Sequence, residues 1–203
     1  MITAHLADPG RLTDMLAEGS QVFVRAVEEA GSRKTKWTAQ LVSAQGTLVS
    51  LDTTLPNRLV KVALEKDAIE ELNGWMIDRA EAPIGHSRFD YLLKNASGEQ
   101  LVLEIKSVTM VQRGVGMFPD APTDRGTRHI KQLIEIQGQV GWKSAVLFVV
   151  QRIDAEKVQA AKQIDPNFAS ALEEAKNAGV RIMANRCQVT LEEIVLGITV
   201  PVV

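Results

Sequence analysis

The stretch that decides the fold is "SRFDYLLKNASGEQLVLEIKSVTM", which runs from Ser87 to Met110. Two runs rich in aliphatic and aromatic residues flank a turn at residues 95–99, and this pattern predicts a β-hairpin. The strands also carry Asp90, Glu104 and Lys106, although charged side chains are seldom buried in a sheet unless they are paired. The first question is therefore where these three side chains lie on the hairpin.

Side-chain alternation along a strand assigns each residue to one face of the sheet. The apolar side chains are expected to share a core face: Phe89, Tyr91 and Leu93 on the first strand, and Leu101, Leu103 and Ile105 on the second. A five-residue turn sets Leu92 opposite Val102 and Asp90 opposite Glu104, and a three-residue turn shifts the pairing by two and keeps the face. In either register Asp90, Glu104 and Lys106 are expected to cluster at the outer end of the other face.

Two interpretations of this cluster remain open. In one, it is an ion-pair cluster at a half-solvated sheet end, where Lys106 offsets a carboxylate repulsion of roughly 0.2–1 kcal/mol. In the other, it is a hard-cation site, since carboxylate oxygens suit Mg²⁺ or Mn²⁺, and Lys106 is placed to orient or deprotonate an attacking water. The D…ExK pattern alone is weak, but the predicted convergence of the three residues strengthens the second interpretation.

Length and composition predict a soluble, cytoplasmic protein. The chain has 203 residues, of which 45% are hydrophobic, enough for one large domain or two small ones. The longest purely apolar run, from Ala145 to Val150, is too short to span a bilayer, and the N-terminus shows no signal-peptide pattern. A lone Cys187 excludes an intramolecular disulfide and a four-cysteine zinc site.

The charge balance restricts how the protein could contact nucleic acid. The net charge is −2, so binding must come from local basic patches rather than from bulk charge. Two patches are visible, "SRKTK" at Ser32–Lys36 and "DRGTRHIK" at Asp124–Lys131. A solvated surface is the plainer explanation of the first patch taken alone. Trp37 beside it is a candidate for stacking on bases, or equally a core tryptophan.

The predicted secondary structure changes along the chain. Residues 1–52 predict short strands separated by turns, and residues 55–74 carry apolar side chains at helical spacing. From residue 75 onward, strands alternate with helices, which predicts a layered α/β domain. We therefore expect a β-domain with a connecting helix over residues 1–73 and an α/β domain over residues 74–203.

These motifs together resemble known proteins. The hairpin resembles the core of the PD-(D/E)xK nuclease-like fold, with an acid on one strand and E-x-K on the next. The whole chain resembles the sugar fermentation stimulation protein A family, through stretches that include "TAHLADPGRL", "TTLPNRLV", "FPDAPTDRGTRHIKQL" and "VLFVVQR". The resemblance implies an N-terminal OB-like β-barrel followed by a nuclease-like α/β/α domain, with DNA binding and a link to the regulation of sugar metabolism.

The resemblance also implies roles for individual residues. Asp90, Glu104 and Lys106 fall on the nuclease motif as catalytic residues, and Glu81 matches a glutamate that completes a metal site with Asp90 and Glu104. The basic segment at a predicted helix N-terminus is expected to contact phosphate, because free N–H groups and the helix dipole favour an anion there. The expected nucleic-acid contacts are Arg125, Arg128, His129, Lys34, Lys36 and Trp37.

Three functions follow as hypotheses. The first is a metal-dependent phosphodiesterase acting on DNA, and the second is a non-catalytic DNA-binding regulator on the same scaffold. The third is an enzyme acting on a small phosphorylated or sugar substrate, because a fold does not fix a function. DNA binding is the leading prediction, and nuclease chemistry comes second.

The N-terminal barrel raises a separate expectation. Five strands are needed to close an OB-like barrel. Only four are visible in the sequence, at residues 2–5, 21–27, 35–44 and 47–52. We therefore expect a truncated chain or a start placed too late, with an incomplete barrel, unless the C-terminal "ITVPVV" fills the gap.

Overall fold

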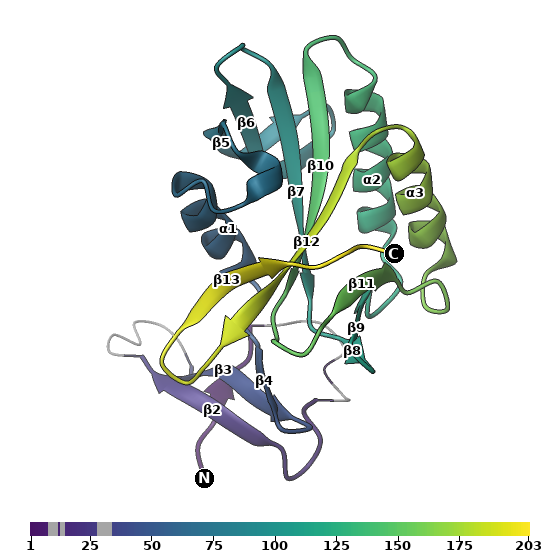
Figure 1. Ribbon diagram of the computed structural model, residues 1–203. Coiled ribbons are helices and arrows are strands. Elements are labelled where there is room, and N and C mark those ends of the chain that lie inside the picture. Colours follow the sequence, from purple (N-terminus) through teal and green to yellow (C-terminus); the bar gives the residue numbers. More distant parts are fainter. Residues whose placement is uncertain (8–11, 13–14, 28–33) are drawn as a thin grey trace.

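The computed structural model describes residues 1–7, 12, 15–27 and 34–203, and it contains a small N-terminal sheet and a larger sheet layered between helices (Figure 1). The small sheet has four strands: β1 (Ala4–His5), β2 (Gln21–Ala26), β3 (Trp37–Ala44) and β4 (Thr47–Ser50). The strand β3 is the centre, because it pairs with the other three. These strands lie within two residues of the predicted ones.

The C-terminal segment does not complete this small sheet. Residues Ile194–Thr199 form β13, which pairs antiparallel with β12 (Arg181–Val189) in the larger sheet. Farther along, Val202 forms a bridge with Val158. The alternative in which "ITVPVV" fills the barrel is therefore wrong, and the described residues of the N-terminal part form a four-stranded sheet.

The larger sheet has six strands in the order β13-β12-β10-β7-β6-β5. Its remaining bounds are β5 (Trp75–Ile84), β6 (Ser87–Asn95), β7 (Gln100–Val108) and β10 (Trp142–Val150). The three central strands β7, β10 and β12 run parallel, and β6 pairs antiparallel with both β5 and β7. A separate small sheet is formed by β8 (Val111–Gln112), β9 (Val115–Phe118) and β11 (Lys157–Ala160).

Helices cover both faces of the six-stranded sheet, which confirms the predicted α/β/α layering (Figure 1). The helix α1 (Leu55–Glu65) lies on one face, and α2 (Asp124–Gln137) and α3 (Pro166–Asn177) pack together on the other. A short 3₁₀ turn, Glu70–Leu72, leads into β5. No helix in the described part of the chain is long and apolar enough to cross a membrane.

Each face of the six-stranded sheet has its own hydrophobic core. One core joins the sheet to α2 and α3, and the other joins it to α1. The second core also takes in Leu41, Phe23 and Leu48 from the N-terminal sheet. The connecting helix α1 packs on β5, β7 and β13, so it belongs to the layers of the larger sheet, and the two parts of the chain share one buried cluster.

The predicted hairpin register is confirmed, but the predicted alternation of β6 is wrong at one position. Leu92 lies opposite Val102, as a five-residue turn requires. Phe89, however, packs in the core beneath α2 and α3, whereas Tyr91 packs in the core beneath α1. The break in alternation falls at Asp90, where the neighbouring strand β5 carries Glu81 in the left-handed region with a φ of 49°. Glu81 thus lies directly opposite the residue at which the alternation of β6 breaks.

Candidate metal-dependent active site

A pocket of about 350 Å³ lies beside β6 and β7, between the first turns of α1 and α2. Polar side chains dominate its lining, and it includes all three residues of the nuclease-like motif. We call it the acidic pocket. It is lined by Thr53, Pro56, Asn57, Asp90, Glu104, Ile105, Lys106, Ser107, Thr123, Arg125 and Gly126.

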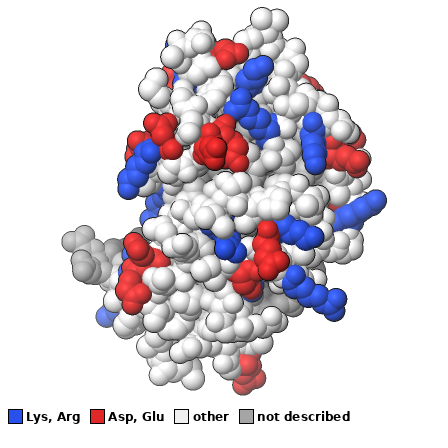
Figure 2. Space-filling model, viewed as in Figure 1, with Lys and Arg blue, Asp and Glu red and all other residues white. Residues whose placement is uncertain are grey.

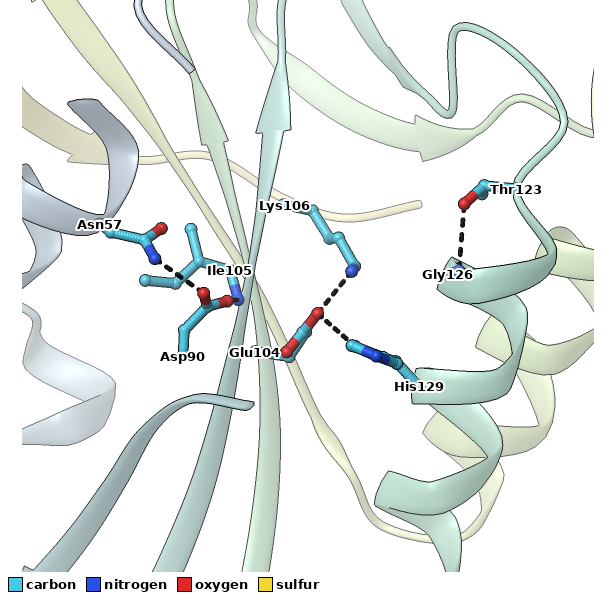
Figure 3. Close-up of polar contacts among 8 residues, drawn as sticks. All are labelled: Asn57, Asp90, Glu104, Ile105, Lys106, Thr123, Gly126 and His129. Atoms are coloured by element: carbon cyan, nitrogen blue, oxygen red, sulfur yellow. Dashed lines mark hydrogen bonds and ion pairs between the residues drawn. The ribbon is translucent and has the colours of Figure 1, made fainter. Parts of the chain in front are cut away.

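Asp90 occupies the point where the ladder between β6 and β7 stops. The last paired residues are Tyr91 and Leu103, and beyond them the Asp90 carboxylate replaces a strand partner. Its Oδ2 accepts a hydrogen bond of 2.7 Å from the Ile105 backbone N–H, and its Oδ1 accepts one of 2.7 Å from Asn57 Nδ2 (Figure 3). Both oxygens are thereby fixed in direction.

The surroundings of Asp90 disfavour its charge. Burial raises the pKa of Asp90 above its usual value, and the negative charge of Glu104 raises it further. The hydrogen bonds from Ile105 and Asn57 and the charge of Lys106 offset part of this effect. A cation between the two carboxylates would relieve the same cost.

Glu104 is the most deeply placed acid of the pocket, with 4% of its surface exposed. Its Oε1 accepts hydrogen bonds from Lys106 Nζ at 2.6 Å and from His129 Nδ1 at 2.7 Å (Figure 3). Burial alone would raise the pKa of Glu104, but the bonds and charges of His129 and Lys106 outweigh it and lower the pKa. The other oxygen, Oε2, is buried and has no hydrogen-bond partner among the described residues.

The structure does not bring Glu81 to this pocket. The Glu81 side chain is 73% exposed and forms an ion pair of 3.4 Å with Arg88. Within the described residues, no three side chains of His, Cys, Asp or Glu are arranged to hold a metal ion. The predicted carboxylates of the site are therefore reduced to two, Asp90 and Glu104.

The basic segment at the start of α2 divides between three environments. Arg125 is exposed and lines the acidic pocket, whereas Arg128 is exposed and lines a different pocket together with Lys131. His129 is only 3% exposed and binds Glu104, so its expected phosphate contact does not fit its position. The helix cap is also occupied, because Gly126 N–H donates to the Thr123 hydroxyl at 3.0 Å.

The predicted nucleic-acid contacts of the N-terminal sheet lie apart from the acidic pocket. Lys34 and Lys36 are exposed just before β3, and Trp37 opens that strand as a half-buried residue opposite Ala26. None of the three lines the acidic pocket. Ser32 and Arg33 of the same patch lie outside the described residues.

The first turn of α1 separates the acidic pocket from a second pocket of about 550 Å³. Thr53, Pro56 and Asn57 line the acidic pocket, while Asp52 and Arg58 line the other one. The second pocket is formed with the N-terminal sheet and with the turn between β12 and β13.

Sequence reasoning missed Asn57 altogether and misassigned His129. Asn57 lies in "LPNRLV", and the only local signal is an amide in the first turn of a helix that buries Val60 and Leu64. His129 lies on the face of α2 that otherwise carries buried apolar residues. A polar side chain on the buried face of a helix is a signal for a partner across the interface, and here the partners are the two acids.

The fold and pocket define a two-domain protein in which an OB domain precedes a nuclease-like domain. Residues 1–51 match the family described as "SfsA N-terminal OB domain", and residues 54–193 match "Sugar fermentation stimulation protein RE domain". The chain belongs to the sugar fermentation stimulation protein family.

Relatives match over nearly the whole chain. A sugar fermentation stimulation protein homolog from Shouchella clausii is 42% identical over 203 residues, covering 100% of this chain and 87% of the relative. A homolog from Moorella thermoacetica is 40% identical over 188 residues, covering 93% and 81%. The solved structure of Pyrococcus furiosus SfsA in complex with Ca²⁺ has a TM-score of 0.89 and 29% identity, covering 100% of this chain and 86% of that one.

Proposed function

We propose that this protein binds DNA and that its acidic pocket is a divalent-metal site for phosphodiester hydrolysis. The observation that carries the proposal is the pair of converging carboxylates, one of which, Glu104, leaves a buried oxygen without a hydrogen-bond partner among the described residues. A buried carboxylate oxygen without a partner costs free energy, and a cation would remove that cost.

The donor set fits a hard cation that takes few protein ligands. Mg²⁺ is commonly held by one or two carboxylates, with water and substrate phosphate oxygens as its remaining ligands. Asp90 and Glu104 provide these two carboxylates. The relative from Pyrococcus furiosus was solved in complex with Ca²⁺, another cation that prefers oxygen, which supports the same class of metal. Bound Mg²⁺ or Mn²⁺ would stabilise the charge that develops during phosphodiester cleavage and lower the pKa of the attacking water.

The other pocket residues act on water and phosphate. The Lys106 ammonium borders the pocket and binds Glu104, so it is placed to orient the attacking water and to offset negative charge. Arg125 lines the same pocket and is placed to contact a phosphate of the substrate. Hydrogen bonds from Asn57 and from the Ile105 N–H hold the Asp90 carboxylate in one orientation.

DNA is proposed as the substrate because the chain also carries an OB domain, a fold that binds oligonucleotides in many proteins. Figure 2 shows basic and acidic side chains interspersed on one face of the molecule, so contacts are expected from local groups such as Arg125, Lys34, Lys36 and Trp37. The names of the relatives associate the family with sugar fermentation, and a regulatory role in sugar metabolism is part of the proposal.

The test is a titration of the protein with Mg²⁺ and Mn²⁺ by calorimetry, followed by binding and cleavage assays on labelled single-stranded and duplex DNA and RNA. We expect metal binding, and binding of DNA that weakens as salt rises. Metal and DNA binding without cleavage by the wild-type protein would favour the non-catalytic regulator. Absence of both kinds of binding would refute the proposal and leave a small-substrate enzyme.

A further inference from the structure

His129 is a buried polar residue on an otherwise apolar face. The helix α2 turns Ile130, Leu133 and Ile136 towards the sheet, and His129 is buried with them. Its Nδ1 lies 2.7 Å from Glu104 Oε1, so the ring contacts the acid rather than the solvent. A side chain that only filled this space would not need a nitrogen atom facing Glu104.

The two donors on Glu104 act on the same oxygen. Lys106 Nζ and His129 Nδ1 both bind Oε1, and Oε2 has no partner among the described residues (Figure 3). The final torsion of a glutamate side chain is broad, so one donor does not fix the plane of the carboxylate. Lys106 reaches Oε1 on a flexible chain, whereas the imidazole of His129 is a rigid ring with one direction for its bond. The fixed direction must therefore come from His129.

The position of His129 is itself restrained, both by a ring contact and by the helix that carries it. Its ring packs on Phe89, with centroids 5.3 Å apart. The start of α2 is closed by the Thr123 cap, and Thr123 N–H donates to Asp165 Oδ2 at 2.8 Å. Asp165 in turn caps α3 by accepting from Phe168 N–H at 2.9 Å. The two helix starts are thereby tied together, which restrains the part of α2 that carries the imidazole.

We propose that His129 is a positioning residue: it holds Oε1 of Glu104 so that Oε2 is presented to the metal in the acidic pocket. The inference rests on the proposed metal site and adds a requirement to it. Carboxylates that bind metals are themselves commonly held by hydrogen bonds, and loss of such a partner typically weakens metal binding by 10–100-fold. On this proposal, His129 contacts neither the metal nor the phosphate.

Two nearly matched substitutions separate this role from packing. An asparagine side chain can place its N–H₂ near the position of the histidine Nδ1, whereas leucine fills similar space without a donor. We expect His129→Asn to bind Mn²⁺ within about threefold of the wild type, and His129→Leu to bind it at least tenfold more weakly, as measured by calorimetry. Thermal unfolding without metal shows that each variant is folded.

A double-mutant cycle with Glu104→Gln provides a second measurement when the leucine variant unfolds. If His129 acts through Glu104, His129→Ala and Glu104→Gln lose less in combination than the sum of their separate losses in Mn²⁺ affinity. Additive losses would overturn the inference, as would a leucine variant that binds Mn²⁺ like the wild type. Failure of the wild-type protein to bind Mn²⁺ would instead refute the proposed metal site itself.

Discussion

Two pairs of glutamate and basic side chain lie on strands of the same sheet and differ in their exposure to water. In the acidic pocket, the Glu104 and Lys106 side chains are 6% and 12% exposed. On β5 and β6, the Glu81 and Arg88 side chains are 73% and 67% exposed. An exposed pair contributes about 0–1 kcal/mol and needs no further partner, whereas a buried acid must have each oxygen compensated. Burial therefore separates a candidate site from a surface ion pair of similar composition.

The largest expected difference between the two pairs is in metal binding. Asp90→Asn and Glu104→Gln should weaken Mn²⁺ binding about 100-fold or more, equal to about 2.7 kcal/mol, because each removes a charged ligand. Glu81→Gln is the matched control and should change the affinity less than twofold. Calorimetry measures all three, and an equal loss for Glu81→Gln would return that residue to the metal site.

The next effect concerns the residue that holds Asp90 from α1. Asn57→Leu removes the donor to Asp90 Oδ1, which leaves a mostly buried acceptor unpaired. We expect a loss of about 1–3 kcal/mol in the free energy of unfolding, measured with urea. Lys61→Ala in the same helix is the control, since Lys61 is exposed and only forms a 3.9 Å pair with Glu65. Equal losses of stability in the two variants would show that the hydrogen bond from Asn57 to Asp90 is unimportant.

A smaller effect distinguishes the two arginines at the start of α2. Because Arg125 lines the acidic pocket and Arg128 lines another one, only Arg125 should contact a phosphate bound there. Arg125→Ala should reduce the log–log salt slope of duplex-DNA binding by about 0.9, and Arg128→Ala by less. This revises the sequence-based expectation that each arginine contributes one contact. Fluorescence anisotropy at several salt concentrations gives the slopes, and equal slopes for both variants contradict the assignment.

The smallest effect concerns how the free energy of unfolding depends on pH, which should have opposite signs for the two acids of the pocket. The pKa of Glu104 is lowered in the folded protein, so its ionisation stabilises the fold above about pH 4.3, and this contribution is lost as the pH falls through the folded pKa. The pKa of Asp90 is raised, so its protonated form stabilises the fold below about pH 3.9, and this contribution is lost as the pH rises through the folded pKa.

Urea unfolding between pH 3.5 and 7, with chelator present, tests this difference. As the pH falls, the wild type should lose stability relative to Glu104→Gln and gain stability relative to Asp90→Asn. The same sign for both comparisons would show that the two carboxylates share one environment.

Period-two alternation was sufficient to predict part of the site. It set Leu92 opposite Val102 and placed Glu104 and Lys106 on one face, because register depends on local chain geometry. Asp90 lines the same pocket, but from the point where the alternation breaks. It failed at Phe89, beside the place where Glu81 on the neighbouring strand takes a left-handed conformation, and one strand's sequence does not contain that information.

The contacts that complete the pocket could not be predicted in the same way. Asn57 binds a residue 33 positions away, and His129 binds one 25 positions away, across the packing of helices on the sheet. The sequence predicted the helix containing each residue but not its rotation towards the acids. The prediction that Glu81 completes the metal site failed for another reason. A matching residue type at a matching place in the chain does not fix the direction of its side chain.

The first turn of α1 borders both the acidic pocket and the second pocket, so one short segment contacts the surroundings of both. Asn57 presents its amide to Asp90, and the adjacent Arg58 pairs with Asp52 in the compartment under the N-terminal sheet. The Tyr91 hydroxyl also donates to the Asn57 carbonyl at 3.0 Å, which fastens this turn to β6. A molecule that fills the second pocket would therefore contact the same helix turn whose Asn57 binds Asp90.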